Sequence, residues 1–163
     1  MTINFKTKTL QEYLDQLSRR EPVPGGGSVA ALTAALGLGL ISMVANYSIG
    51  RRANTVAVEK RLAKILAKSE LIRRRLLELT SLDSEAYLKV SAARSLDKKA
   101  QHQAAREARA VPQEVCKLCF KAVLLTPYLA QKGNSYLLSD LEVALELLMS
   151  AFSAARIMVR INS

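Results

Sequence analysis

Apolar residues recur along most of this chain at intervals of three and four positions, which is the periodicity of one face of an α-helix. The clearest case lies within residues 54–96, where ten positions step by alternating fours and threes. These positions are Val58, Leu62, Ile65, Ser69, Ile72, Leu76, Leu79, Asp83, Ala86 and Val90. Eight of the ten are apolar, and Ser69 is small. The spacing predicts a long helix with one packed seam, on which Asp83 stands where the pattern requires an apolar residue.

The amino-terminal half carries two further helical signals. Residues 9–18 predict a short leading helix. Residues 28–50 contain no charged side chain and are rich in Ala, Gly and Ser. Small residues let neighbouring helices approach closely, so this segment is predicted to be a central helix buried on all sides.

The carboxyl-terminal half predicts two more helical regions. Residues 99–131 form the first, in which Pro112 and Pro127 mark kinks or breaks and Gly133 follows as a C-cap. Ser139 begins a Ser-x-x-Glu sequence, which predicts a capping box at the start of the last helix. An apolar stripe then continues to the carboxyl end.

Composition supports an all-α fold. Half of the residues are hydrophobic, Gly and Pro are sparse, and helix-forming residues dominate. We expect one domain over residues 1–163, built as a bundle of about five helices, some long and kinked. An unbroken helix of some forty residues would extend about 60 Å, so its excess apolar surface should pack against a second copy in a symmetric dimer.

The formal charge of +10 indicates an anionic partner or simply a basic surface. Nucleic acid is an unlikely partner, because the chain has no Trp, few aromatic residues and only scattered basic pairs. Residues 28–50 are long enough to span a membrane, but their small and polar residues and the arginines on both sides argue against insertion. Residues 1–10 lack an apolar signal core, which predicts a cytoplasmic protein.

Metal chemistry has little support in the sequence. Cys116 and Cys119 with a single imidazole, His102, cannot complete a four-ligand zinc site. The two cysteines are interpreted as small apolar residues on a buried helix face, and His102 as an exposed residue in a polar stretch. The sequence therefore predicts no zinc site.

The sequence PVPGGGSVAAL at residues 22–32 is the most unusual stretch. A nucleotide-binding Walker loop is excluded, since that motif follows a strand and ends in Gly-Lys-Ser/Thr. Two interpretations remain. Ser28 can cap a helix whose free N–H groups attract an anion, or the glycines can form a linker that lets two helices pass closely.

This stretch and four later ones resemble the family of formimidoyltetrahydrofolate cyclodeaminases and methenyltetrahydrofolate cyclohydrolases, the carboxyl-terminal half of formiminotransferase-cyclodeaminase. The later stretches are DSEAYLKV at residues 83–90, VPQEV at 111–115, KGNSYLLSD at 132–140 and VRIN at 159–162. The resemblance covers nearly the whole chain. It implies an all-α fold, a symmetric dimer or larger oligomer, and a folate site between helices and subunits.

The resemblance also implies the reaction. A cyclohydrolase hydrolyses 5,10-methenyltetrahydrofolate to 10-formyltetrahydrofolate, whereas a cyclodeaminase closes 5-formiminotetrahydrofolate with loss of ammonia. Both reactions need a base and an acid beside one carbon atom, and the resemblance implies no metal and no cofactor other than the tetrahydrofolate substrate. Hydrolysis is slightly preferred, because no formiminotransferase domain accompanies this chain. The alternative is a helical binding or scaffold protein with a basic surface that keeps the fold without turnover.

Asp83 is the first candidate for the catalytic group, because a carboxylate on an apolar seam is desolvated and its pKa can move toward neutrality. The competing interpretation is a helix break at which Thr80 and Asp83 form a capping motif. Asp140 is the second candidate, either as an acid that stabilises a helix start or as a paired acceptor for the edge of a pterin. The predicted substrate-binding residues are Gly25, Gly26, Gly27, Ser28, Arg51, Asn134, Arg160 and Asn162.

Overall fold

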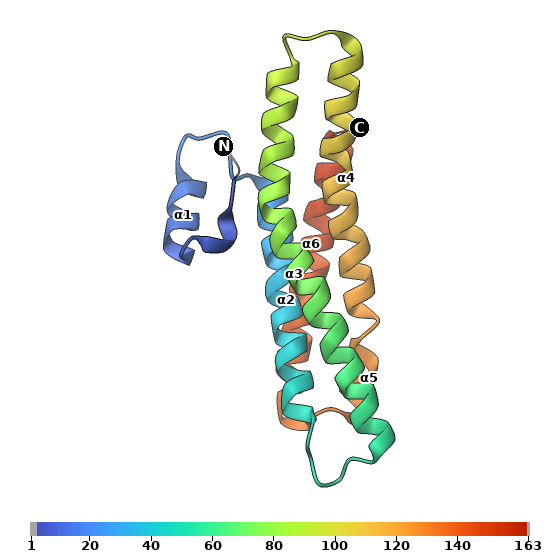
Figure 1. Cartoon of the computed structure of the whole chain (residues 1–163). Helices are drawn as coiled ribbons and strands as arrows, with labels where there is room; N and C mark the ends of the chain where they lie inside the picture. Colours follow the sequence, from blue (N-terminus) through green and yellow to red (C-terminus); the bar gives the residue numbers. More distant parts are fainter. Residues whose placement is uncertain (1–2, 163) are drawn as a thin grey trace.

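Four long helices run alternately up and down in one elongated bundle (Figure 1). The structure, a computed structural model, describes residues 3–162. Its helices are α1 (Leu10–Ser18), α2 (Gly26–Ser48), α3 (Val56–Ala93), α4 (Lys98–Val123), α5 (Thr126–Lys132) and α6 (Leu138–Ile161), with short 3₁₀ turns at Phe5–Thr7 (η1) and Ser135–Leu137 (η2). The described residues contain no strand, so the prediction of an all-α fold is confirmed. The region expected at residues 99–131 is divided into α4 and α5.

The core lies where α2 packs against both α3 and α6, with α4 completing the bundle. The seam predicted along α3 is confirmed, since its positions from Leu62 to Leu79 are buried and Asp83, the acid on the seam, is half-buried. The helix break considered at Asp83 is wrong, because α3 continues for 38 residues without interruption. At 1.5 Å per residue it is about 57 Å long.

Small residues on α2 set the distance between the central helices. A Cβ atom on Gly37 would lie 3.0 Å from the carbonyl oxygen of Ala144 and 3.2 Å from Cγ of Leu148, both on α6. A Cβ atom on Gly39 would meet nothing within 4 Å. Gly37 therefore permits the close packing of α2 on α6, whereas Gly39 does not contribute to it.

Alanine substitutions at these two glycines should have opposite effects on stability. Gly37→Ala pushes against a backbone carbonyl and should lower the free energy of unfolding by about 1–2 kcal/mol. Gly39→Ala gains helix propensity in free space and should raise it by up to about 1 kcal/mol. Urea unfolding followed by circular dichroism measures both, and equal effects at the two positions would contradict this account of the packing.

Two predicted helix ends differ from the structure. The capping box at Ser139 is wrong: α6 begins at Leu138, and its N-cap Leu137 makes no side-chain capping bond. Asn134 instead caps the preceding turn η2, where its Oδ1 accepts a hydrogen bond from the Tyr136 N–H at 3.1 Å. Gly133 is the C-cap of α5, as predicted.

The apolar character of α2 arises from its place in the core. This helix is long and apolar enough to cross a membrane, but 61% of its most apolar window is buried inside the bundle. Cys119 is buried on α4, where burial raises its thiol pKa to about 12. No group of three or more potential metal ligands occurs among residues 3–162.

Candidate functional site

The carboxylate of Asp83 on α3 lies directly against the first turn of α2. A Cβ atom on Gly27 would overlap it, at 2.6 Å from Oδ2 and closer still to Oδ1. The backbone N–H of Ser28 donates a hydrogen bond to the same carboxylate. The acid on the apolar seam and the triple glycine thus form one site, in which the missing side chain of Gly27 provides the space for Asp83.

Burial dominates the electrostatics of this carboxylate. It raises the pKa of Asp83 from its ordinary value of 3.8 to about 6, and the hydrogen bond from the Ser28 N–H offsets only part of the rise. Asp83 forms no ion pair with any other residue that the structure describes. Near neutral pH the group can therefore accept a proton and return it, as a general base and acid must.

The sequence interpretation gave Ser28 the wrong position. Gly25 is the N-cap of α2 and has no side-chain capping bond, so Ser28 lies inside the first turn. Its hydroxyl group is fully buried and shares a hydrogen bond of 2.9 Å with the hydroxyl of Tyr13 on α1. Ser28 therefore links α3 to α1: its backbone N–H donates to Asp83, and its hydroxyl group shares a hydrogen bond with Tyr13.

Tyr13 was not singled out from the sequence, although it lies in the same site. Its ring is buried and packs edge-on against Phe5, with 5.3 Å between ring centroids. Burial raises the pKa of its phenol, the hydrogen bond to Ser28 lowers it, and the negative charge of Asp83 raises it. In the sequence, Tyr13 is only an aromatic residue in a short amphipathic helix. Such a residue more often belongs to the core than to a functional site.

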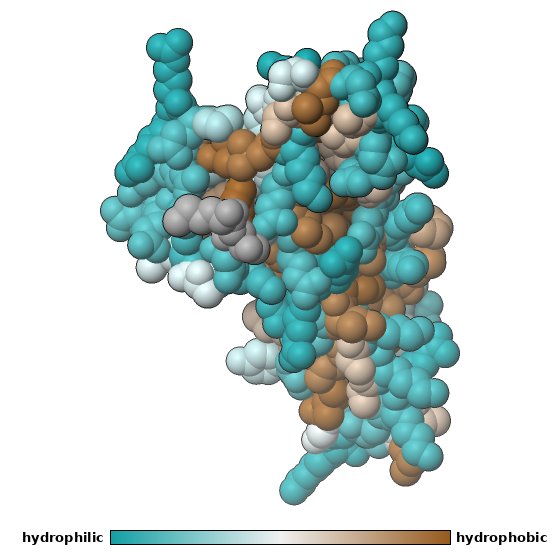
Figure 2. Space-filling view, turned by 45° about the horizontal axis from the view of Figure 1, so that its top comes forward, coloured by the Kyte–Doolittle hydropathy of each residue, from teal (hydrophilic) through white to brown (hydrophobic). Residues whose placement is uncertain are grey.

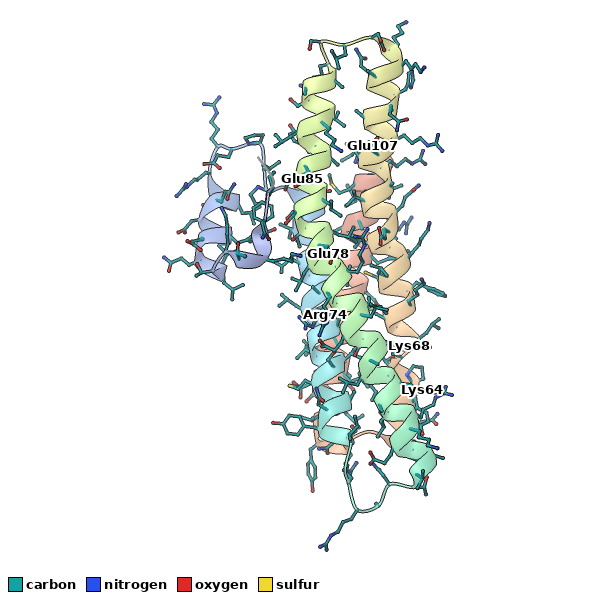
Figure 3. The ribbon with its side chains drawn as sticks, in the orientation of Figure 1. Lys64, Lys68, Arg74, Glu78, Glu85 and Glu107 are labelled. Atoms are coloured by element: carbon teal, nitrogen blue, oxygen red, sulfur yellow. The ribbon has the colours of Figure 1, made fainter. Side chains whose placement is uncertain are left out.

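The amino-terminal segment is held against α3 beside this site. The Phe5 N–H donates a hydrogen bond to Oγ of Ser81 at 3.0 Å, and the Ile3 N–H donates to Oε1 of Glu85 at 3.1 Å. Figure 3 shows Glu85 on the stretch of α3 that lies beside this segment. These bonds fix the position of α1 and therefore that of Tyr13.

The KGNSYLLSD stretch lies at the opposite end of the bundle, where its loop is fastened to the end of α2. Nη1 of Arg51 donates a hydrogen bond to the carbonyl oxygen of Gly133 at 2.9 Å. The Asn134 N–H donates to Oγ of Ser48, also at 2.9 Å. Arg51, considered as a partner for a folate tail, thus has a structural contact here, and Ser48 is a residue that sequence reasoning missed.

One chain does not bring all the predicted site residues together. Asp140 is half-buried in the first turn of α6, whereas Met158 near the other end of that helix lies beside Gly26. Met158 is 18 positions further along the helix than Asp140, which places Asp140 about 27 Å from the glycine turn. Asp140 and Asp83 of the same chain therefore lie in different parts of the bundle and cannot form one site.

Two further predicted residues lie near the carboxyl end of α6. Arg160 lines a cleft between α4 and α6 together with Lys117 and Cys116, rather than the face of α6 that meets the glycine turn. Asn162 is the C-cap of α6, and its backbone N–H donates to the carbonyl oxygen of Met158 at 3.1 Å.

The raised pKa of Asp83 predicts how stability depends on pH. Between about pH 4 and pH 6 the folded chain binds more protons at Asp83 than the unfolded chain, so this contribution to the free energy of unfolding falls as pH rises through that window. Ionised Asp83 costs the fold about 3 kcal/mol. The Asp83→Asn variant should gain stability relative to the natural chain as pH rises, as urea unfolding at about pH 4 and pH 7 would measure. Parallel pH curves would contradict the raised pKa.

Fold and site together define an all-helical protein with one desolvated carboxylate set into a glycine-rich helix start. This chain belongs to the formiminotransferase-cyclodeaminase family, whose model matches residues 9–163. The resemblance seen in the sequence is confirmed.

Individual relatives agree with that assignment. A methenyltetrahydrofolate cyclohydrolase from Methylorubrum extorquens is 35% identical, over 96% of this chain and 79% of the relative. The formimidoyltransferase-cyclodeaminase of Rattus norvegicus is 30% identical over 94% of this chain, which spans 30% of that larger protein. The crystal structure of formiminotetrahydrofolate cyclodeaminase from Thermotoga maritima superimposes with a TM-score of 0.92 at 31% identity, covering 96% of this chain and 78% of that one.

Proposed function

We propose that this chain is a folate one-carbon enzyme that hydrolyses 5,10-methenyltetrahydrofolate to 10-formyltetrahydrofolate, or closes 5-formiminotetrahydrofolate with release of ammonia. Hydrolysis is the preferred reaction. The observation that carries the proposal is the half-buried carboxylate of Asp83, which packs against Gly27 and has a pKa of about 6 in a chain of this family. The substrate is the tetrahydrofolate derivative itself, with no metal or further cofactor.

In the hydrolytic reaction, Asp83 accepts a proton from water while the water oxygen bonds to the bridging carbon of the methenyl cation. The tetrahedral adduct then breaks its bond to N5. Asp83 returns its proton to N5, and the hydroxyl proton of the adduct leaves to solvent as the formyl carbonyl forms on N10. One water is consumed and one proton released, and the same carboxylate serves as base and acid.

In the cyclodeaminase reaction the nucleophile is N10 of the substrate. Asp83 accepts the N10 proton as this nitrogen bonds to the carbon of the protonated formimino group (N5–CH=NH2+). It then transfers that proton to the resulting amine, which leaves as ammonia as the methenyl cation forms. Gly25, at which a Cβ atom would meet nothing within 4 Å, is proposed to leave space for a flat heterocycle near the carboxylate. Asp140 is proposed to accept hydrogen bonds from the pterin edge, with Asn134, Arg160 and Asn162 as further binding residues.

A second copy of the chain is proposed to complete the site. Three helices present apolar residues that the single chain leaves exposed: Leu10 and Leu14 on α1, Leu36 and Tyr47 on α2, and Val143 and Ile157 on α6. Figure 1 shows α1 standing beside the bundle rather than within it. Burial of this surface in a two-fold dimer would remove it from water.

An antiparallel dimer also accounts for the separation of the two carboxylates. If α2 and α6 of two copies pack with opposite directions, the glycine turn and Asp83 of one copy lie near the Asn134 loop and Asp140 of the other. Asp140 and the glycine turn, which are about 27 Å apart within one chain, would then meet across the interface between two chains. We place this dimer in the cytoplasm, where the two unpaired cysteines remain reduced.

The near-ultraviolet absorbance of methenyltetrahydrofolate tests the proposed reaction. Purified protein should accelerate its disappearance over the buffer blank, and ammonia release from 5-formiminotetrahydrofolate should be measured in parallel to decide between the two reactions. Absence of both activities, together with absence of folate binding by calorimetry, would overturn the proposal.

A further inference from the structure

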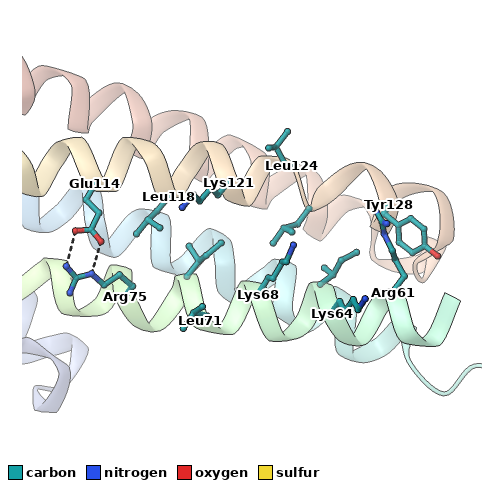
Figure 4. Close-up of a pocket in the computed structure, with 13 residues that line it drawn as sticks. Arg61, Lys64, Lys68, Leu71, Arg75, Glu114, Leu118, Lys121, Leu124 and Tyr128 are labelled. Atoms are coloured by element: carbon teal, nitrogen blue, oxygen red, sulfur yellow. Dashed lines mark hydrogen bonds and ion pairs between the residues drawn. The ribbon is translucent and has the colours of Figure 1, made fainter. Parts of the chain in front are cut away.

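A groove runs between α3 on one side and α4 with α5 on the other (Figure 4), and Asp83 is not among the residues that line it. Its volume is about 900 Å³. Asp83 faces α2, whereas this groove opens between α3 and α4. The residues used below are Arg61, Lys64, Lys68, Leu71 and Arg75 on α3, and Glu114, Leu118, Lys121, Leu124 and Tyr128 on α4 and the segment that follows it.

Unpaired cations border both sides of the groove. Lys64 and Lys68 on α3 and Lys121 on α4 are exposed, and none of the three forms an ion pair within residues 3–162. The single acid in the groove wall, Glu114, is neutralised by Arg75 through two hydrogen bonds of 2.7 and 2.9 Å. Arg75 holds the pKa of Glu114 below its ordinary value, so the acid stays ionised within this pair.

The floor and lips of the groove are apolar. Leu118 is buried in the floor, whereas Leu71 is 72% exposed on one lip and Leu124 is 62% exposed on the other. In the space-filling view, apolar residues form a band along the lower half of the bundle between hydrophilic borders (Figure 2). An occupant that suits this surface must combine an apolar face with negative charges on both flanks.

Polar contacts mark the two ends of the groove. The Arg75–Glu114 pair lies at one end, and at the other the guanidinium of Arg61 lies over the ring of Tyr128, 5.2 Å from its centroid. Arg75 is 14 positions further along α3 than Arg61, which is about 21 Å of helix. That length accommodates about four turns of a ligand helix.

We propose that this groove binds an acidic amphipathic helix of a partner protein. Its apolar anchors would occupy the floor and cover Leu71 and Leu124, as in other helix-in-groove complexes. Its carboxylates would face Lys64 and Lys68 on one wall and Lys121 on the other, which gives charge complementarity. A nucleic acid fits less well, since the floor is apolar and the aromatic ring of Tyr128 is already covered by Arg61.

A synthetic helical peptide tests this proposal without knowledge of the natural partner. The probe is a fluorescent peptide of about fifteen residues with leucines at positions i, i+3, i+4 and i+7 and glutamates on both flanks. Its anisotropy on titration with the full chain gives the affinity. The control peptide keeps the leucines and replaces the glutamates by lysines, and it should bind at least about tenfold more weakly.

Charge-reversed variants locate the binding surface. The double substitution Lys64→Glu with Lys68→Glu should weaken binding of the acidic peptide at least about tenfold at low salt. Lys98→Glu with Lys99→Glu, an equal change of charge on exposed residues at the start of α4, should change it less than about twofold. The pair Leu71→Ser and Leu124→Ser should also weaken binding, and this loss should persist at high salt.

Several results would overturn the proposal. Equal weakening by the two charge reversals would show attraction to net charge alone. Equal binding of the two peptides would show that charge complementarity makes no contribution to binding. A lower oligomeric state for the Lys64 and Lys68 variant in sedimentation would mean that a second copy covers the groove. Displacement of the peptide by phosphatidylserine vesicles, with the same dependence on Lys64 and Lys68, would indicate a lipid surface. The cyclohydrolase assay is independent of all these measurements, because the groove does not include Asp83.

Discussion

An Asp83→Asn variant is expected to lose turnover of methenyltetrahydrofolate by about 10²–10⁴-fold, the range that a positioned general acid and base contributes. Asparagine keeps the size of the side chain, and its carbonyl oxygen can still accept the hydrogen bond from the Ser28 N–H. It cannot take a proton from water or return one to N5. Substrate binding measured by calorimetry should change much less than kcat.

The natural chain and two variants separate this effect from damage to the fold. Asp83→Asn should be at least as stable as the natural chain at about pH 7, because it removes a buried charge. Glu85→Gln alters a half-buried carboxyl group two residues further along α3 and should keep full activity, since an amide oxygen can still accept the Ile3 N–H. Retained turnover in Asp83→Asn would remove Asp83 from the mechanism.

A Gly27→Ala variant should lose most activity for a steric reason. The added methyl group would occupy the space of the Asp83 carboxylate, so either the first turn of α2 or the Asp83 side chain must move. Overpacking of this kind lowers the free energy of unfolding by about 1–3 kcal/mol. A displacement of about 1 Å at a reacting group can reduce turnover by about 10²-fold.

The neighbouring glycines supply matched controls for this substitution. A Cβ atom on Gly25 meets nothing within 4 Å, and one on Gly26 makes only an ordinary contact of 3.5 Å with Sδ of Met158. Within one chain, alanine at Gly26 should preserve stability. Alanine at Gly25 should lower the free energy of unfolding by up to about 1 kcal/mol, because Gly25 is the N-cap of α2 and alanine is a poor N-cap residue. Thermal unfolding compares the stability of the three variants, and if Gly27→Ala were as stable as Gly26→Ala, the packing of Asp83 against Gly27 would be incorrect.

The response of activity to pH gives the two variants a common test. The natural chain should lose kcat/KM as pH falls through about 6, where Asp83 takes up a proton and can no longer act as a base. Residual activity in Asp83→Asn should not show this step. In Gly27→Ala the step should move, because the displaced carboxylate has a different degree of burial.

Local patterns in the sequence determined the helices and the unusual acid. Helical periodicity depends on residues three and four apart, so the seam of α3 and the place of Asp83 on it were readable without a structure. The glycine stretch was equally visible, and its motif carried the family resemblance. Helix ends were less readable, since Ser28 and Ser139 both have capping chemistry, but other residues begin α2 and α6.

Only the tertiary structure decided which of these features meet. The sequence places Asp83 and Gly27 on different helices, and their contact depends on how α2 and α3 pack along their whole lengths. The bond between Tyr13 and Ser28 has the same origin, as does the separation of Asp140 from the glycine turn. Contacts between helices depend on the relative rotation and offset of whole elements, which local spacing does not fix.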